Sequence, residues 1–212
     1  MIIGVDEAGR GCIIGPMVIC AAAIKPLDEY KLKELGVRDS KKLSPLQRQR
    51  LYPKVAHLCK YVTVKITAQE LNSLMDKHSL NEIEAMKVAF ALDSLGMRQA
   101  TAYIDSPDNV PAKFCRRIDK YANAKPKLVC ANKADDRYLI VGAASIIAKV
   151  TRDREIEKIK QETGIDFNSG YTSDPMTQDV ISRRKQYPQL HPFLRLKWST
   201  LQSEKQKKLS DF

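Results

Sequence analysis

The chain has 212 residues, with 36 Lys and Arg against 25 Asp and Glu, so its formal charge at pH 7 is +11. This length suits one domain or one domain with an appendage. The 43% hydrophobic and 29% charged contents argue against disorder. No apolar run reaches the roughly 18 residues of a membrane-spanning helix. The acids Asp6 and Glu7 fall where a secretory signal would be apolar, so none is expected.

The basic balance fits either a well-solvated surface or a protein that binds a polyanion, and charge alone does not separate the two. The five cysteines are odd in number, widely scattered and without a CxxC pair: Cys12, Cys20, Cys59, Cys115 and Cys130. We therefore expect neither a disulfide framework nor a zinc site. Since four of them have apolar neighbours, we interpret them as small core side chains. This cysteine usage predicts a reducing compartment and a cytoplasmic protein.

The first half of the chain predicts three strands and two helical regions. Residues 1–5 form an apolar run that stops at Asp6, as in a buried strand that ends in a polar site. Glycines punctuate the next loop, and residues 18–24 predict a neighbouring strand. Helix-prone segments follow at 28–36 and 45–59, the second with Ser44 as a favourable N-cap before Pro45. Residues 61–67 alternate in the manner of a half-buried strand.

The second half alternates helices and strands. The clearest helix spans 79–96, where Ser79 can cap it, Ile83, Met86 and Phe90 share one face, and Gly96 closes it. Strands at 101–104 and 127–131 flank a helix at 111–121, and a long helix begins near 138. A further helix spans 175–185. This order predicts an α/β fold with a mixed sheet flanked by helices, divided into a core at 1–165 and a C-terminal helical extension at 166–212 that carries Tyr171.

Acidic side chains follow the predicted strands at the points where those strands end. Asp6 and Glu7 follow the first strand, Asp105 follows the fourth, and Asp135 and Asp136 lie just beyond the fifth. Strand ends are where sites converge in α/β sheets, and a buried carboxylate there is costly unless a cation offsets it. Several carboxylates without a nearby His or Cys favour Mg²⁺ or Mn²⁺ over zinc. The alternative is that these acids cap helices or pair with surface lysines.

Two further segments suit contacts with nucleic acid. Gly9, Arg10 and Gly11 follow the first acids almost directly, and glycines let backbone groups approach a ligand such as a ribose 2′-hydroxyl. The block 39–43 contains Lys41 and Lys42, which suit phosphate contacts. Taken singly, the first segment is also compatible with a plain tight turn and the second with a solvated loop.

Together these segments resemble type 2 ribonuclease H (ribonuclease HII), in the family's order and over most of the chain. The opening signature is residues 4–11 with Gly15 and Pro16. The other matching blocks are 39–43, 103–105, 133–135, 143–153 and the tyrosine loop 169–171 with 173–175. The absence of long flanking extensions and the stretch 197–200 are similar to the archaeal and eukaryotic branch.

The resemblance implies a ribonuclease H-like fold and an endonuclease that cuts RNA in RNA/DNA hybrids. It also implies incision on the 5′ side of ribonucleotides embedded in duplex DNA. By position, the metal-binding and catalytic acids would be Asp6, Glu7, Asp105 and Asp135, with two divalent ions expected alongside substrate. The sugar-contacting set would be Gly9, Arg10, Gly11 and Tyr171, and the candidate phosphate contacts would be Lys41, Lys42, Lys133 and Lys149.

Two positions depart from the family's pattern. Thr172 follows the tyrosine where the family often has proline, which removes a fixed φ angle and puts the rigidity of the loop in doubt. Cys12 follows Gly11 where other small residues or proline often stand, and its position near the site raises the question of oxidation.

The C-terminal region is basic, with eight Lys or Arg and one acid between Arg183 and Lys208. It is either a surface that grips a duplex backbone, or a helix whose aromatics Tyr187, Phe193 and Trp198 turn inward. Two rival functions remain open: another nuclease of the same fold, and a non-catalytic basic nucleic-acid-binding protein. We take a monomer as the default state.

Overall fold

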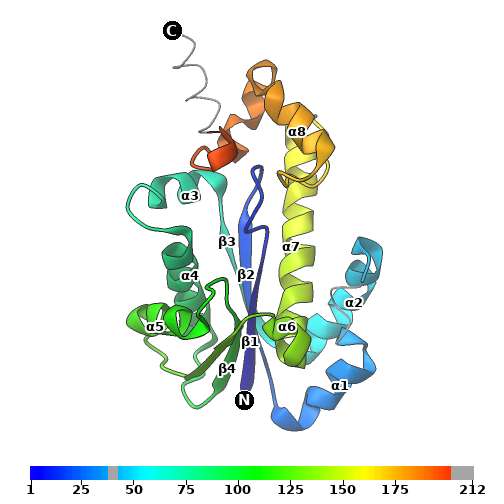
Figure 1. The fold of residues 1–212 in the computed structure, drawn as a ribbon. Helices are drawn as coiled ribbons and strands as arrows, with labels where there is room; N and C mark the ends of the chain where they lie inside the picture. Colours follow the sequence, from blue (N-terminus) through cyan, green and yellow to red (C-terminus); the bar gives the residue numbers. More distant parts are fainter. Residues whose placement is uncertain (38–42, 202–212) are drawn as a thin grey trace. The chain divides into compact units, whose positions relative to one another are not determined.

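The computed structural model describes residues 1–37 and 43–201 (Figure 1). The candidate phosphate contacts Lys41 and Lys42, and the basic residues after 201, therefore lie outside the described residues. Among those described, no helix is both long enough and apolar enough to cross a membrane.

One five-stranded mixed sheet organises the fold, in the order β3-β2-β1-β4-β5. The strands are β1 (Ile2–Ala8), β2 (Met17–Ile24), β3 (Lys60–Ile66), β4 (Thr101–Asp105) and β5 (Lys127–Ala131). Strand β1 is antiparallel to β2 and parallel to β4, and β4 is parallel to β5. All five predicted strands are confirmed, and so is the mixed sheet flanked by helices.

The end of β1 differs from the prediction, which stopped the strand at Val5. The parallel pairing with β4 does end at Val5, opposite Ile104. The antiparallel pairing with β2 continues through Asp6 and Glu7 to Ala8. The two acids therefore lie within a paired strand, which fixes their backbone more firmly than a loop would.

Eight α-helices appear among the described residues. They are α1 (Glu29–Glu34), α2 (Pro45–Leu58), α3 (Ala68–Leu74), α4 (Leu80–Leu95), α5 (Pro111–Tyr121), α6 (Ala134–Arg137), α7 (Leu139–Thr163) and α8 (Pro175–Ser182). Short 3₁₀ helices lie at η1 (Pro26–Asp28), η3 (Arg184–Gln186) and η4 (Pro188–Phe193). The helix predicted over 175–185 ends at Ser182, and the sequence analysis did not predict α3 or α6.

The ends of α4 are as predicted, but its buried face is not. The Ser79 side chain accepts a hydrogen bond from the Glu82 amide at 3.3 Å, and Gly96 closes the helix in the left-handed region. Of the predicted apolar face, Ile83 is buried but Phe90 is 60% exposed. The buried face includes small residues such as Ala85 and Ala89. Close packing against other elements favours these small side chains over larger apolar ones.

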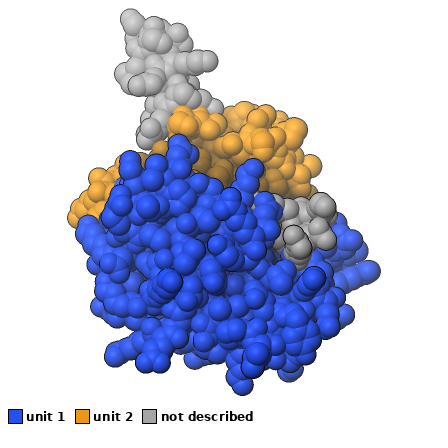
Figure 2. Space-filling view, turned by 60° about the horizontal axis from the view of Figure 1, so that its bottom comes forward, with its two compact units in different colours: residues 1–8, 18–65, 79–151 blue, residues 9–17, 66–78, 152–212 orange. Residues whose placement is uncertain are grey.

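The described chain divides into two compact units (Figure 2). Unit 1 consists of Met1–Ala8, Val18–Lys65 and Ser79–Thr151, and unit 2 of Gly9–Met17, Ile66–His78 and the residues from Arg152 onward. Both units are discontinuous in sequence, whereas the predicted domains, 1–165 and 166–212, are continuous. That division of the chain into domains stays a prediction.

Unit 1 contains the sheet and a core on each of its faces. Figure 1 shows α4 and α5 on one side of the sheet and α1 and α2 on the other. On the α2 side, alternate residues of β2 pack with the start of α7, in a cluster that includes Cys20, Ala22, Val55, Ala144 and Ile147. The small side chains at the start of α7 let this helix lie close to the sheet.

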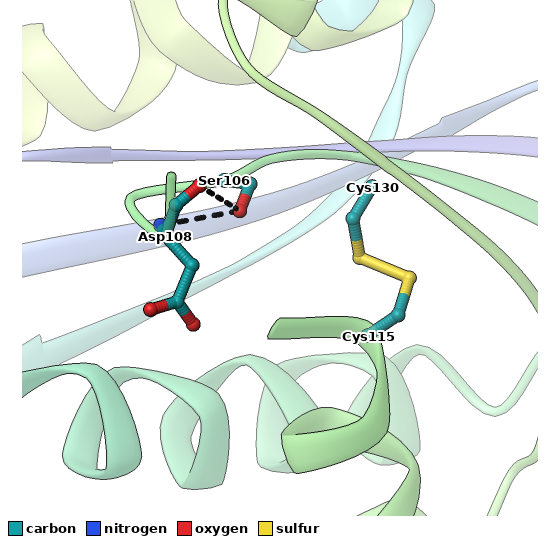
Figure 3. The surroundings of a disulfide bond; sticks show 4 residues. All are labelled: Ser106, Asp108, Cys115 and Cys130. Atoms are coloured by element: carbon teal, nitrogen blue, oxygen red, sulfur yellow. Dashed lines mark hydrogen bonds between the residues drawn. A yellow bond between two sulfur atoms is a disulfide. The ribbon is translucent and has the colours of Figure 1, made fainter. Parts of the chain in front are cut away.

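A disulfide joins Cys115 of α5 to Cys130 of β5, with their Cα atoms 5.8 Å apart (Figure 3). The expectation that the chain has no disulfide, with its cysteines in the core, is wrong for this pair. Sequence spacing gave no sign of it, because the two residues meet only when α5 packs on β5. Cys12, Cys20 and Cys59 are buried free cysteines, as predicted.

Unit 2 has its own core. Ile13 and Ile14 pack with residues of the second half of α7, of α8 and of η4, including Ile156 and Leu190. Three aromatic side chains of the C-terminal region, Tyr187, Phe193 and Trp198, pack against this core while partly buried. These contacts support the interpretation in which the three aromatic side chains turn inward.

Candidate active site

Three carboxylates of unit 1 meet at one edge of the sheet. Ligand atoms of Asp6, Glu7 and Asp105 all lie within 4.8 Å of one another. Asp6 and Asp105 follow Val5 and Ile104, which are paired residues of two parallel strands, so their side chains emerge at the same edge. Neighbouring strand residues usually point to opposite faces, yet Glu7 joins the same group. The convergence predicted for these three acids is confirmed.

Close packing behind the carboxylates fixes the position of β1. A Cβ atom on Gly4 would lie 2.2 Å from the carbonyl oxygen of Ile140 at the start of α7. Only glycine leaves room for this approach, and the same helix carries Ser145 and Lys149. The glycine in the opening signature thus has a packing role two residues before Asp6.

The electrostatics of Asp6 are those of a crowded, buried acid. Burial raises its pKa well above the ordinary value of 3.8, and the neighbouring Glu7 and Asp105 raise it further. The fully buried Ser145 hydroxyl and the charge of Lys149 act in the opposite direction and lower the pKa. The net effect raises the pKa of Asp6, and a bound cation would favour its ionised form.

Asp135 lies next to this group rather than inside it. It is buried in the first turn of α6, while its neighbour Ala134 donates a backbone hydrogen bond to Asp105 Oδ1 at 2.7 Å. The preceding Asn132 side chain donates to the carbonyl oxygens of Ser106 and Asp108, at 2.9 and 2.8 Å. The segment after β5 is therefore bound directly to the loop after β4.

The lysines predicted to contact phosphate have different placements. Lys149 of α7 interacts electrostatically with Asp6 and lowers its pKa. Lys133 is exposed and adopts a left-handed conformation with φ of 55° as the N-cap of α6. No position is described for Lys41 and Lys42.

The donor set fits a hard divalent cation. It consists of carboxylate oxygens, and the metal-ligating group found among the described residues includes no His or Cys. Oxygen-only sets of this kind suit Mg²⁺ and Mn²⁺ rather than zinc. The raised pKa of Asp6 is a second sign that cation binding would relieve mutual repulsion here.

A separate cluster in unit 2 joins the glycine loop to Tyr171. Gly9 has φ of 79°, and a Cβ atom there would lie 2.7 Å from the Pro16 carbonyl oxygen. Cys12 forms an isolated antiparallel bridge with Tyr171, whose ring lies 4.0 Å from the Cβ position of Gly11. The structure thus brings together the predicted sugar-contacting residues Gly9, Gly11 and Tyr171 within one unit.

Arg195 holds the glycine loop from inside the protein. Its side chain is fully buried and donates to the carbonyl oxygens of Gly15, Arg10 and Gly9, at 2.9, 2.9 and 2.7 Å. Its guanidinium also lies 4.8 Å from the centre of the Trp198 ring. Burial lowers its pKa to about 10, which still leaves it charged at neutral pH. Arg195 is therefore not one of the surface cations of the basic C-terminal region.

Arg152 holds together the residues around Tyr171, as Arg195 does for the glycine loop. It donates to the Cys12 sulfur at 2.9 Å and to the Ser169 carbonyl, and its guanidinium lies 4.9 Å from the centre of the Tyr171 ring. Burial raises the Tyr171 pKa to about 12, so its hydroxyl keeps its proton and can donate. The sequence analysis assigned no role to Arg152 or Ser145, although both lie in the block 143–153.

The tyrosine loop is well anchored without the family's proline. One Asp174 carboxylate oxygen accepts hydrogen bonds from the Ser169 hydroxyl at 2.6 Å and the Asn168 side chain at 2.7 Å. The other oxygen accepts from the Met176 and Thr177 amides, which caps α8. Side-chain hydrogen bonds thus take over the restriction that a proline after Tyr171 would impose.

Comparisons with known proteins identify the family. A sequence model of ribonuclease HII matches residues 3–201. A ribonuclease HII from Archaeoglobus fulgidus is 40% identical over 209 residues, which is 99% of this chain and 98% of the relative. Structures of a PCNA:RNase HII complex from the same organism and of ribonuclease H2 from Pyrococcus horikoshii both have a TM-score of 0.86.

The first of these structures is 39% identical and covers 94% of this chain and 95% of its own. The second is 42% identical, with 97% of each chain covered. Relatives named ribonuclease HII come from several archaea. The two rival functions left open by the sequence have no support among these matches. The chain belongs to the ribonuclease HII family, on its archaeal branch, and is a ribonuclease H endonuclease that depends on divalent metal ions.

Proposed function

We propose that this chain incises on the 5′ side of ribonucleotides embedded in duplex DNA and also cuts the RNA strand of RNA/DNA hybrids. The observation that carries the proposal is the convergence of Asp6, Glu7 and Asp105 at one sheet edge of a protein with a net charge of +11. Carboxylates alone would repel a phosphate backbone, whereas bound divalent cations reverse the local charge.

In this account Asp6, Glu7, Asp105 and Asp135 hold two ions, Mg²⁺ or Mn²⁺, when substrate is bound. When bound, the ions supply an activated water and stabilise the leaving 3′-oxygen. The carboxylates bind cations and do not attack phosphorus, so no covalent intermediate forms and the phosphorus inverts. The products carry a 3′-hydroxyl and a 5′-phosphate. Lys149 favours the ionised form of Asp6, and Lys149 and Lys133 are the candidate phosphate contacts among the described residues.

The glycine loop and Tyr171 supply selectivity for ribose. A 2′-hydroxyl both donates and accepts hydrogen bonds, so backbone groups of Gly9, Arg10 and Gly11 can recognise it from either side. Tyr171 offers an aromatic face for the sugar and a protonated hydroxyl. The bonds from Arg195 occupy carbonyl oxygens on the inner side of this loop and hold its shape.

The test uses three duplexes of one sequence: all-DNA, DNA with a single ribonucleotide, and an RNA/DNA hybrid. With Mg²⁺ or Mn²⁺ we expect one nick 5′ of the ribonucleotide, multiple cuts in the hybrid and none in all-DNA. The nicked end should be extendable by a DNA polymerase, because it carries a 3′-hydroxyl. Binding to all three duplexes without cleavage would instead support the non-catalytic alternative.

We also propose PCNA as a partner and the cytoplasm as the location. The Archaeoglobus fulgidus relative has been solved in complex with PCNA, which supports the same association here. Size-exclusion chromatography of this chain with PCNA should show one co-eluting peak, and separate elution would argue against the association. The chain's own disulfide does not oppose a cytoplasmic location, since some archaeal intracellular proteins contain disulfides.

A further inference from the structure

One face of α5 carries a row of cationic side chains that the proposed chemistry does not use. Lys113, Arg116, Arg117 and Lys120 are spaced i, i+3, i+4 and i+7, which places them on one side of a helix. With Glu82 of α4 they line a hollow of about 340 Å³. The opposite side of α5 carries the buried Phe114 and Ile118.

Two of these four cations, Arg117 and Lys120, form ion pairs that hold α5 in place. Arg117 pairs with Glu82 at 2.8 Å and with Asp108 at 3.3 Å, and Lys120 lies 3.5 Å from Glu82. The Tyr121 hydroxyl donates to Glu82 at 2.5 Å. These contacts engage Glu82 and Asp108, and a third acid, Asp119 of the same helix, pairs with Lys125 at 3.1 Å.

Lys113 and Arg116 are the surplus charges. Both are exposed, and no ion pair is found for either among the described residues. They share the face of Arg117, which neighbouring acids have already neutralised. The row therefore presents two uncompensated positive charges to solvent.

The row is fixed relative to the carboxylates, because both belong to unit 1. The loop that follows Asp105 runs directly into α5, and Arg117 binds Asp108 within that loop. Ser106 and Asp108 form a local turn through the Ser106 hydroxyl (Figure 3). The Cys115–Cys130 disulfide joins the same helix to β5. Its α5 residue, Cys115, lies between Lys113 and Arg116 in the sequence.

We propose that Lys113 and Arg116 form a non-catalytic contact with the phosphate backbone of the substrate duplex, away from the cleaved bond. The contact adds affinity that is independent of base sequence and of ribose. The ligand of this contact is the duplex named in the proposed function, so the inference rests on that proposal for the identity of its ligand. Two fixed charges with no ion pair among the described residues, on a helix held by a disulfide and three ion pairs, suit an extended polyanion better than a small anion.

The test measures binding to an all-DNA duplex without divalent ions, as a function of salt concentration. Each phosphate contact contributes about 0.9 to the slope of log K against log salt. The Lys113→Ala/Arg116→Ala double variant should therefore lower the slope by about 1.8. Between 50 and 200 mM salt, the wild type should lose about twelvefold more affinity than the variant.

The matched control is Lys33→Ala/Lys54→Ala, which removes the same charge from exposed positions of α1 and α2. Figure 1 shows these helices on the opposite side of the sheet from α5. The control should keep the wild-type slope. An equal change in both variants would mean that net charge alone matters, and an unchanged slope in the α5 variant would refute the contact.

Unaltered melting temperatures would show that both variants fold. The outcome is separate from that of the cleavage test, because this duplex contains no ribonucleotide and no metal is present. Normal nicking with an unchanged salt slope would remove only the α5 contact. A lowered slope with no nicking would remove only the proposed incision activity.

Discussion

Burial of Asp6 beside Glu7 and Asp105 makes folding without metal dependent on pH. Because the folded protein holds a proton on Asp6 that the unfolded chain releases near its ordinary pKa of 3.8, stability falls as pH rises from that value through the raised pKa. At neutral pH, Asp6→Asn should therefore melt at a higher temperature than the metal-free wild type. The difference should shrink as pH falls towards 4.

The same variant should lose its response to divalent ions. An ion at 100 times its Kd stabilises the folded state by about 2.7 kcal/mol, so Mg²⁺ or Mn²⁺ should raise the melting temperature of the wild type but hardly that of Asp6→Asn. Thermal melts across pH, with and without metal, check both effects. A lower metal-free melting temperature for the variant would contradict the electrostatic account of Asp6.

Tyr171 should matter more for a single ribonucleotide than for a long hybrid. In a hybrid, many sugars offer productive positions, whereas an embedded ribonucleotide offers only one. We expect Tyr171→Ala to reduce kcat/KM on the single-ribonucleotide duplex by roughly 5- to 160-fold more than on the hybrid, as loss of a stacking contact worth about 1–3 kcal/mol implies. Equal losses on both substrates would argue against recognition of the sugar.

Arg195 shows what the sequence could not reveal at the residue scale. In the sequence it is one of several cations in a basic stretch, and no local pattern marks it as buried. Its partners are the carbonyl oxygens of Gly9, Arg10 and Gly15, at least 180 positions away. By contrast, the convergence of Asp6, Glu7 and Asp105 was predicted from where the apolar runs stop, although Asp6 and Glu7 themselves lie within β1.

Arg195→Met should destabilise the protein strongly, because three buried carbonyl oxygens would lose their donor. A loss of about 3–5 kcal/mol in unfolding free energy is expected, as for other broken buried charge networks. Arg195→Lys keeps the charge but not the planar fork of donors, so it should recover only part of that stability. Chemical denaturation measures both variants, and a Lys variant equal to wild type would show that charge alone suffices.

At the scale of elements, the disulfide between α5 and β5 was the main surprise. Cysteine counting indicated a reduced protein, and only the packing of α5 on β5 brings Cys115 and Cys130 together. The strands were easier to predict because each carries its own apolar or alternating pattern. The short helices α3 and α6 have no comparable signal, and α4 buries small residues where its larger apolar side chains suggested another face.

The disulfide should stabilise unit 1. It closes a loop with a sequence separation of 15, for which loop entropy predicts about 3 kcal/mol. For a chain of this size, that corresponds to roughly 6–12 °C in melting temperature. We expect the Cys115→Ser/Cys130→Ser variant and the reduced wild type to melt at the same lowered temperature. An oxidised wild type that melts no higher than the double variant would show that the bond contributes nothing.

At the scale of the whole molecule, the placement of the acidic residues is as informative as the net charge of +11. Most of the basic excess lies on exposed surfaces, whereas the acids Asp6 and Asp135 are buried. A basic protein with a buried group of acids suits a nuclease, because bound cations make the acidic site attractive to phosphate as well. The sequence indicated this contrast, and the structure added the Arg195, Arg152 and Asp174 contacts that support the glycine and tyrosine loops.

The most direct test of this account is cleavage of a duplex with one ribonucleotide by wild type and Asp105→Asn at saturating Mg²⁺ or Mn²⁺. The Asn side chain keeps the size of Asp105 but removes one anionic ligand. We predict a fall in kcat of at least about 100-fold, together with weaker metal binding by calorimetry and an unchanged far-UV spectrum. Wild-type cleavage by Asp105→Asn would contradict the assignment of this carboxylate group as the metal centre.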